Sequence, residues 1–144
     1  MEHLTKVDFY LVQGNDTPSR YRFACRLVDK AYTLGHRVHI HTNTAHTASQ
    51  LDDLLWSFHD RSFIPHDIEP QNQAHIPVTI GHGWVPNQCD VLINLAAEIP
   101  EFFARFKRVA EIIDQDEHRR ERGRTHYRHY RDHGCALTHH QLKS

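Results

Sequence analysis

The sequence contains few cysteines and no apolar run long enough to span a membrane. Cys25, Cys89 and Cys135 are odd in number and widely spaced along 144 residues. This spacing predicts buried thiols in a reducing compartment rather than a disulfide framework. No segment approaches the roughly 20 apolar residues of a membrane helix, and the N-terminus lacks the basic-then-apolar pattern of a signal peptide. We therefore expect a cytoplasmic protein with no membrane association.

Glycine is scarce where a nucleotide site would need it. The first expected strand, residues 7–12, is followed by Gln-Gly-Asn-Asp-Thr-Pro, which has one glycine and no Lys-Ser or Lys-Thr pair. Such a loop lacks the glycines that let a backbone wrap around phosphates. An ordinary strand-to-helix turn, with Asp16 or Thr17 as the helix cap, is the favoured interpretation. We expect no nucleotide and no other cofactor.

Signatures of catalysis are also missing. No serine lies in a Gly-x-Ser-x-Gly elbow, and no cysteine has a general base nearby in the sequence. Among fifteen histidines, His39 and His41 share one side of an expected strand, with His36 close in sequence. Because no Asp, Glu or Cys completes a set of three zinc ligands, incidental histidines are favoured. A small metal-dependent enzyme that uses these three histidines remains an alternative.

The apolar pattern predicts a single α/β domain over residues 1–144, with a mostly parallel central sheet and helices on both faces. Strands are expected at 7–12, 37–41, 78–81, 90–95 and 109–113, and an extended segment at 62–65. Helices are expected at 18–35, from a cap at Thr44 or Thr47 to 56, at 100–108 and, rich in arginine, from about 117 to Gly134. Residues 67–75 read as a polar loop, and residues 135–144 as a loose or docked tail.

The C-terminal helix is strongly basic. Residues 118–131 contain six arginines and one acid, Glu121, a net charge of +5, whereas the other residues have eleven Lys and Arg against seventeen Asp and Glu, a net charge of −6. Helical spacing places one set of side chains on a single face: Arg120, Arg124, Tyr127, Arg128 and Arg131. This basic face is suited to an acidic partner.

A second cluster is aromatic and apolar. Trp56, Phe58, Phe63, Ile64 and Pro65 lie at the end of an expected helix and in the segment after it. Core packing explains such a cluster, and so does an interface, where exposed aromatic anchors carry much of the binding energy. Trp56 is one step away from the apolar stripe of its helix, which favours the interface for that residue. Both interpretations stay open.

Several short motifs occur together in one order along the chain. They are Phe-Tyr-Leu at 9–11, Gly-His-Arg-Val at 35–38, Leu-Asp-Asp-Leu-Leu-Trp at 51–56, Ser-Phe-Ile-Pro-His at 62–66, Asp-Val-Leu-Ile-Asn-Leu at 90–95 and Tyr-Arg-His-Tyr-Arg at 127–131. In these motifs, and over essentially its whole length, the chain resembles the chi subunits of bacterial DNA polymerase III holoenzyme. Residues 67–88 match poorly.

The resemblance implies a Rossmann-like fold without a nucleotide and a protein without catalytic activity of its own. Such a subunit belongs to a DNA-directed DNA polymerase whose nucleotidyltransferase activity resides in another subunit. It joins the clamp loader through the psi subunit. It also binds the acidic, phenylalanine-terminated C-terminal tail of single-stranded DNA-binding protein during DNA replication, so its contact with nucleic acid is mainly indirect.

The resemblance also implies which residues bind. Arg120, Arg124, Tyr127 and Arg128 match the family's tail-binding positions, and Ile113 stands where an apolar residue helps to form the pocket. Arginine replaces the lysine common in the family at 120 and 128, which makes bidentate contacts with carboxylates possible.

Trp56 and Phe63 match the aromatic residues that face psi. In some members of the family the same surface receives a repair helicase instead. One alternative from a different class remains, in which the arginine helix contacts the phosphates of a nucleic acid directly.

Overall fold

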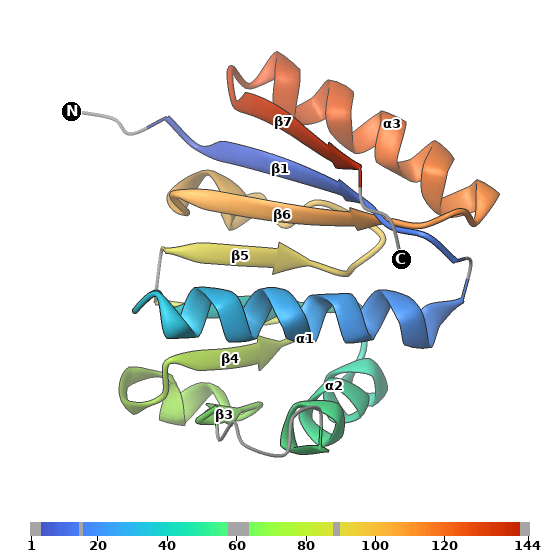
Figure 1. Ribbon diagram of the computed structural model, residues 1–144. Helices are drawn as coiled ribbons and strands as arrows, with labels where there is room; N and C mark the ends of the chain where they lie inside the picture. The colour runs from blue at the N-terminus through green and yellow to red at the C-terminus, as the bar shows by residue number, and fades with distance from the viewer. Residues whose placement is uncertain (1–3, 15, 58–63, 88–89, 142–144) are drawn as a thin grey trace.

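The computed structural model describes residues 4–14, 16–57, 64–87 and 90–141 and builds them around one parallel sheet (Figure 1). Its seven strands lie in the order β3-β4-β2-β5-β6-β1-β7, and each neighbouring pair is parallel. The strands are β1 Lys6–Leu11, β2 Val38–His41, β3 His66–Asp67, β4 Val78–Gly81, β5 Val91–Asn94, β6 Arg108–Ile113 and β7 Ala136–Gln141. The expected Rossmann-like α/β class is confirmed.

Helices cover both faces of the sheet. Helices α1 (Thr17–Thr33) and α2 (Ala45–Ser57) share one face, and α3 (Glu117–Asp132) lies behind β1 and β7 on the other (Figure 1). Two short 3-10 helices, η1 (Pro70–His75) and η2 (Glu101–Arg105), complete the elements. None of the helices in these described ranges is long and apolar enough to cross a bilayer.

Each face of the sheet has its own apolar core because strand side chains alternate. On β6, Ala110 and Ile112 pack in the core under α1 and α2, whereas Val109 and Ile113 pack in the core under α3. The polar residue between that last pair, Glu111, also points toward α3 and is buried. Strand β6 therefore carries a carboxylate into the interior beneath the basic helix.

The prediction of a helix at 100–108 is wrong. The segment forms η2, with only five residues, and Arg108 already belongs to β6. The Phe106 N–H donates to the Phe103 carbonyl oxygen at 3.1 Å. This bond joins residues three apart, as in a 3-10 helix, rather than four apart, as in an α-helix. Both phenylalanines are buried in the core under α3. Phe106 already has extended backbone, φ −88° and ψ 147°, because the chain enters β6, which pairs with β1 and β5 from Arg108 onward.

Part of the segment expected to be a loose or docked tail is a strand. Ala136–Gln141 form β7, which pairs with β1, and residues 142–144 lie outside the described residues. The expected loop at 67–75 likewise contains the end of β3 and all of η1. Both segments are polar, so neither shows the apolar alternation that marks a strand in a sequence. Of the segment expected to be extended, residues 62 and 63 lie outside the described residues.

Candidate functional site

Helix α3 begins and ends at residues that the sequence specifies well. The Asp116 carboxylate accepts a hydrogen bond from the Arg119 backbone N–H at 3.0 Å, and this hydrogen bond lowers the pKa of Asp116. Beyond the other end, Gly134 has a φ of +78°, a conformation that glycine adopts with little strain. These two residues define where the helix begins and where the chain leaves it.

The buried stripe of α3 consists of Gly123, His126 and Tyr130. A Cβ atom at Gly123 would lie 2.8 Å from Cδ1 of Ile113 on β6, too close for any other residue without movement. Glycine therefore lets the helix backbone approach the sheet. The arginine face lies beside this stripe rather than opposite to it, so it borders the sheet and can form the wall of a groove.

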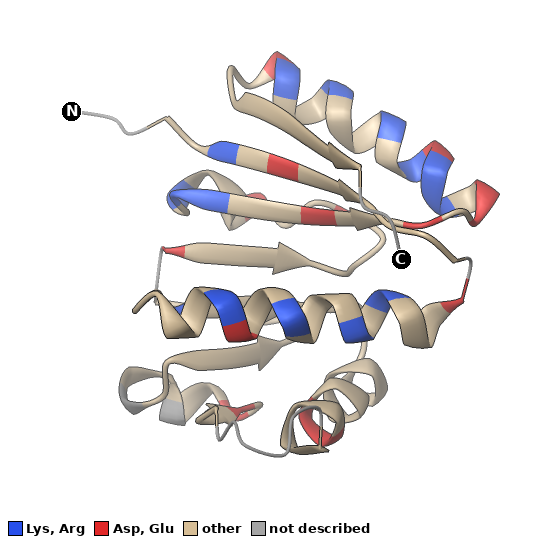
Figure 2. Ribbon diagram, viewed as in Figure 1, with Lys and Arg blue, Asp and Glu red and all other residues tan. Residues whose placement is uncertain are grey.

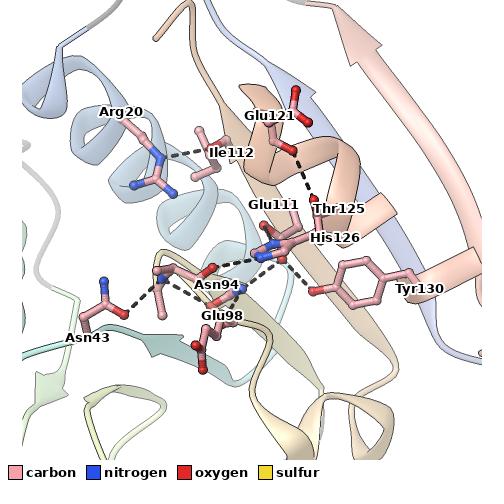
Figure 3. Close-up of polar contacts among 12 residues, drawn as sticks. Arg20, Asn43, Asn94, Glu98, Glu111, Ile112, Glu121, Thr125, His126 and Tyr130 are labelled. Atoms are coloured by element: carbon pink, nitrogen blue, oxygen red, sulfur yellow. Dashed lines mark hydrogen bonds and ion pairs between the residues drawn. The ribbon is translucent and has the colours of Figure 1, made fainter. Parts of the chain in front are cut away.

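A buried polar network holds the same stripe against the sheet (Figure 3). The Tyr130 hydroxyl donates to Oε2 of Glu111 at 2.6 Å, and Nδ2 of Asn94 donates to that oxygen at 2.9 Å. Nδ1 of His126 lies 3.1 Å from Oε1 of Glu111, and its Nε2 lies 2.9 Å from the Ala97 carbonyl oxygen. Glu111 is only 2% exposed, so its partners replace water.

The network favours a positively charged His126. Both ring nitrogens face oxygen acceptors, and only the doubly protonated ring donates to both. Burial lowers the pKa of His126, but the hydrogen bond and the charge of Glu111 raise it by more, so the pKa is raised overall. Burial, followed by the charge of Glu111, raises the pKa of Tyr130 and keeps its hydroxyl a donor. When His126 is protonated, it forms a buried ion pair with Glu111 beneath the basic helix.

Beside this network, α3 and the sheet enclose a groove of about 470 Å³. From α3 it is lined by Arg120, Gly123, Arg124, Tyr127, Arg128 and Arg131. From the sheet it is lined by Phe9, Leu11, Ile113 and His139. The residues predicted for tail binding, including Ile113 from a different element, therefore come together around one hollow. In Figure 2 basic residues follow one another along α3 above the sheet.

The arginines of the groove differ in how far they are neutralised. Arg124 Nη1 lies 2.7 Å from Oε2 of Glu121, and Arg131 Nη2 lies 3.3 Å from Oδ1 of Asp132. Arg120 and Arg128 have no carboxylate within ion-pair distance in the described part of the chain. All four side chains are exposed. The groove therefore presents a positive charge that its own acids compensate only in part.

Aromatic rings form part of the groove's floor. The Tyr127 ring lies 5.7 Å from Phe9 and 5.2 Å from His139, and Phe9 and His139 are 5.7 Å apart, as measured between ring centroids. The three rings come from α3, β1 and β7. This cluster, next to Leu11 and Ile113, offers an apolar surface to a ring that enters between the arginines.

The second predicted surface lies at the other end of the sheet. Trp56 is 50% exposed near the end of α2, and its ring lies 4.2 Å from that of the buried His66. Phe63 lies outside the described residues. Strands β3 and β4, beside α2, and strand β7, beside α3, occupy opposite ends of the strand order (Figure 1). The two predicted surfaces are therefore well separated.

The histidines of the metal alternative do not converge. His39 and His41 pack against Phe102, whereas His36 lines a separate cavity beside Lys30. His39 Nδ1 lies 2.7 Å from Thr79 Oγ1, and burial lowers its pKa to about 3. Nowhere in residues 4–14, 16–57, 64–87 and 90–141 do three side chains suited to a metal come together.

The turn after β1 is an ordinary helix entry. The Asp16 carboxylate accepts a hydrogen bond from the Ser19 backbone N–H at 3.0 Å, so of the two candidate caps, Asp16 and Thr17, Asp16 is the cap. Of the three cysteines, Cys25 is buried, and burial raises its pKa to about 12. Cys135 is partly buried, and Cys89 lies outside the described residues.

Sequence reasoning missed four residues of the groove. Phe9 and Leu11 alternate on β1 and could have been assigned to the α3 side only if the pairing of β1 were known. Gly123 sits inside a helix, where an unexplained glycine is a usable signal of close packing. His139 had no signal, because the strand that carries it was not predicted.

Comparison with known proteins gives consistent matches. A family model described as DNA polymerase III chi subunit, HolC, matches residues 4–138. A DNA polymerase III subunit chi from Pseudomonas aeruginosa is 40% identical over 140 residues, which cover 96% of this chain and 98% of that protein. The subunits of that name from Haemophilus influenzae and Escherichia coli are 27% and 24% identical, each over 90% of this chain and 92% of that protein.

Among solved structures, the crystal structure of T4 UvsW matches with a TM-score of 0.68 at 10% sequence identity. The match covers 96% of this chain but only 41% of that chain. At this identity the likeness shows the fold alone.

Proposed function

The chain belongs to the family of DNA polymerase III chi subunits, and we propose that it is a non-catalytic bridge between the clamp loader and single-stranded DNA-binding protein. One partner is the psi subunit, through which the chain joins the clamp loader. The other is the acidic, phenylalanine-terminated C-terminal tail of single-stranded DNA-binding protein. The polymerase chemistry belongs to another subunit.

The arginine-walled groove is the observation that carries this proposal. An acidic tail that ends in phenylalanine needs donors for its carboxylates and an apolar hollow for its ring. Arg120 and Arg128 supply guanidinium groups that no described carboxylate occupies, and Leu11 and Ile113 line the hollow between the helix and the sheet. The charges orient the tail, and the ring gives specificity for its end.

The separation of the two surfaces supports simultaneous binding of both partners rather than binding of one partner at a time. Trp56 lies by the β3–β4 end of the sheet and the groove by the β7 end, so a partner at one does not block the other. Contacts with a short exposed tail are weak, on the order of micromolar, and salt screens them over about 10 Å. Many tails displayed on coated DNA raise the effective concentration and offset this weakness.

An Arg128→Ala variant is expected to bind a tail peptide about tenfold more weakly, because it loses a charged contact worth about 1.5 kcal/mol. Arg124→Ala is the matched control on the same face. Its effect should be smaller, because Glu121 already neutralises Arg124 at 2.7 Å. Isothermal titration calorimetry at low and high salt measures the affinity of each variant for the tail peptide. Equal affinity of Arg128→Ala and the unchanged protein, or binding that ignores salt, would remove the proposed role of the groove.

Direct binding of nucleic acid by the same arginines is the competing function. Polyanions bind basic helices without specificity, so weak affinity for DNA does not separate the two. The terminal phenylalanine does, since a peptide without it should lose most of its affinity for a tail-binding groove. The affinity of a phosphate-binding surface for the two peptides would instead depend only on the number of charges that each peptide carries. Equal binding of the two peptides would favour the nucleic-acid interpretation.

Replacing Trp56 with alanine is expected to weaken psi association at least tenfold while tail binding stays unchanged. An exposed tryptophan at an interface contributes about 2 kcal/mol or more when it is buried by a partner. Co-purification with psi, followed by titration of the tail peptide, reports on both surfaces. If both activities fall together, the variant is unfolded or the surfaces are not independent. If psi association is unaffected, Trp56 is not its anchor, and the repair helicase that the family resemblance implies becomes the next candidate for this surface.

A further inference from the structure

Strand β7 has an open edge beside the groove. β7 pairs with β1, and no other described strand lies on its far side. The Ala136 N–H donates to the Thr5 carbonyl oxygen at 3.1 Å. In a parallel ladder, residues whose backbone N–H and C=O bond to one neighbouring strand alternate with residues whose N–H and C=O point to the opposite side. The backbone groups of Leu137, His139 and Gln141 therefore point toward the open edge.

The groove and the open edge meet at His139. His139 contributes its ring to the groove and its backbone to the edge. From Arg120 to Arg131 the groove follows α3 for eleven residue steps, about 16 Å at about 1.5 Å per residue. An extended peptide covers that length with about five residues, at about 3.3 Å each. The groove is therefore long enough for a short strand, not only for one side chain.

One end of the groove combines an apolar surface with charge. Leu11 and Ile113, the last residues of β1 and β6, line it together with Gly123, and Arg120 and Arg124 flank Gly123 on α3. Arg128 and Arg131 lie toward the other end. A peptide whose terminal ring enters the end lined by Leu11 and Ile113 places its upstream acids under Arg128 and Arg131. Its chain direction is then that of the strands.

We propose that the acidic tail binds as an eighth, parallel strand on the open edge of β7. The proposal rests on the tail-capture function stated above and adds how the tail's backbone is recognised. Leu137, His139 and Gln141 would exchange hydrogen bonds with alternate residues of the tail. The exposed arginines that line the groove favour an acidic chain, and their repulsion disfavours a basic one.

Amide hydrogen exchange on the full chain tests this pattern directly. The probe is a six-residue peptide rich in aspartate with a C-terminal phenylalanine, added to saturation. The amides of Leu137, His139 and Gln141 are expected to exchange at least tenfold more slowly with the peptide bound. The amide of Thr138, which faces β1, is the internal control and should change little. Equal or absent protection across β7 would overturn the strand addition.

Peptides with a single N-methyl group provide a second measurement. Methylation at alternate positions is expected to weaken binding about tenfold, because it removes a hydrogen bond and adds bulk at the edge. Methylation at the positions between should have little effect. On the protein, Gln141→Pro removes one outward N–H and should weaken binding severalfold relative to Gln141→Ala, since edge strands accept proline.

The two proposals fail in different ways. If the unmodified peptide does not bind, both tail capture and strand addition fall. If it binds and every N-methyl peptide binds equally well, tail capture stands and strand addition is wrong. Alternating losses together with alternating protection support both.

Discussion

Replacing Glu111 with alanine is expected to lower the free energy of unfolding by about 3–5 kcal/mol, the largest effect on stability predicted for a single residue of this chain. Glu111 is buried and accepts hydrogen bonds from Tyr130 and Asn94. Its removal leaves the buried Tyr130 hydroxyl and the buried Nδ1 of His126 without their shared acceptor. Chemical denaturation monitored by circular dichroism measures the change. A loss below about 1 kcal/mol would show that the network does not hold α3.

Glu111→Gln is the matched control, because it keeps the shape and the oxygen acceptor but removes the negative charge. Its loss should be smaller, about 1–3 kcal/mol. The pH dependence separates charge from shape. The pKa of His126 is raised above 6.5 in the folded protein, so its contribution is fully present below the unfolded pKa and is lost as pH rises through the folded pKa. This loss, at pH values above about 6.5, should be smaller in Glu111→Gln. An unchanged pH profile would contradict the charged pair.

The double variant Arg120→Glu/Arg128→Glu is expected to weaken binding of the acidic tail at least a hundredfold. Both arginines line the groove, both are exposed, and no described carboxylate pairs with them. Two lost charged contacts account for about 3 kcal/mol, about a hundredfold, and the repulsion between glutamate and the tail adds to this. Fluorescence anisotropy of a labelled tail peptide measures the affinity.

Arg22→Glu/Arg26→Glu on α1 is the matched control for this reversal. It changes the net charge by the same amount and also places glutamates at exposed helix positions, but neither residue lines the groove. Long-range charge alone would make the two variants similar, especially at low salt. Equal losses in both would therefore mean that the groove has no special role.

The sequence alone predicted much of the site because helix spacing is a local property. Arg120, Arg124, Tyr127 and Arg128 share a face for a reason that needs only 3.6 residues per turn. The buried partners of that helix were not predicted in the same way. Glu111 meets Tyr130 across nineteen residues of sequence, and a polar residue inside a strand pattern does not reveal its partner. Ile113 was assigned through family resemblance, not through spacing.

The C-terminal strand, in contrast, could not be predicted from the sequence. Nothing in Ala-Leu-Thr-His-His-Gln marks a strand that packs on a core, because β7 is an edge strand with several exposed side chains. It forms because β1 offers it a complete row of backbone partners, with Lys6 opposite Ala136 and Leu11 opposite Gln141. Its exchange of hydrogen bonds with β1 depends little on side-chain type.

By itself, then, the sequence determined the alternation of strands and helices, the caps at Asp16 and Asp116, and the charge of one helix face. Each of these depends on residues a few positions apart. The tertiary structure decided that the basic face borders a hollow, that Gly123 lets α3 approach Ile113, and that an open strand edge meets the hollow at His139. These features depend on contacts between residues far apart in the chain, and only packing of the whole sheet selects such contacts.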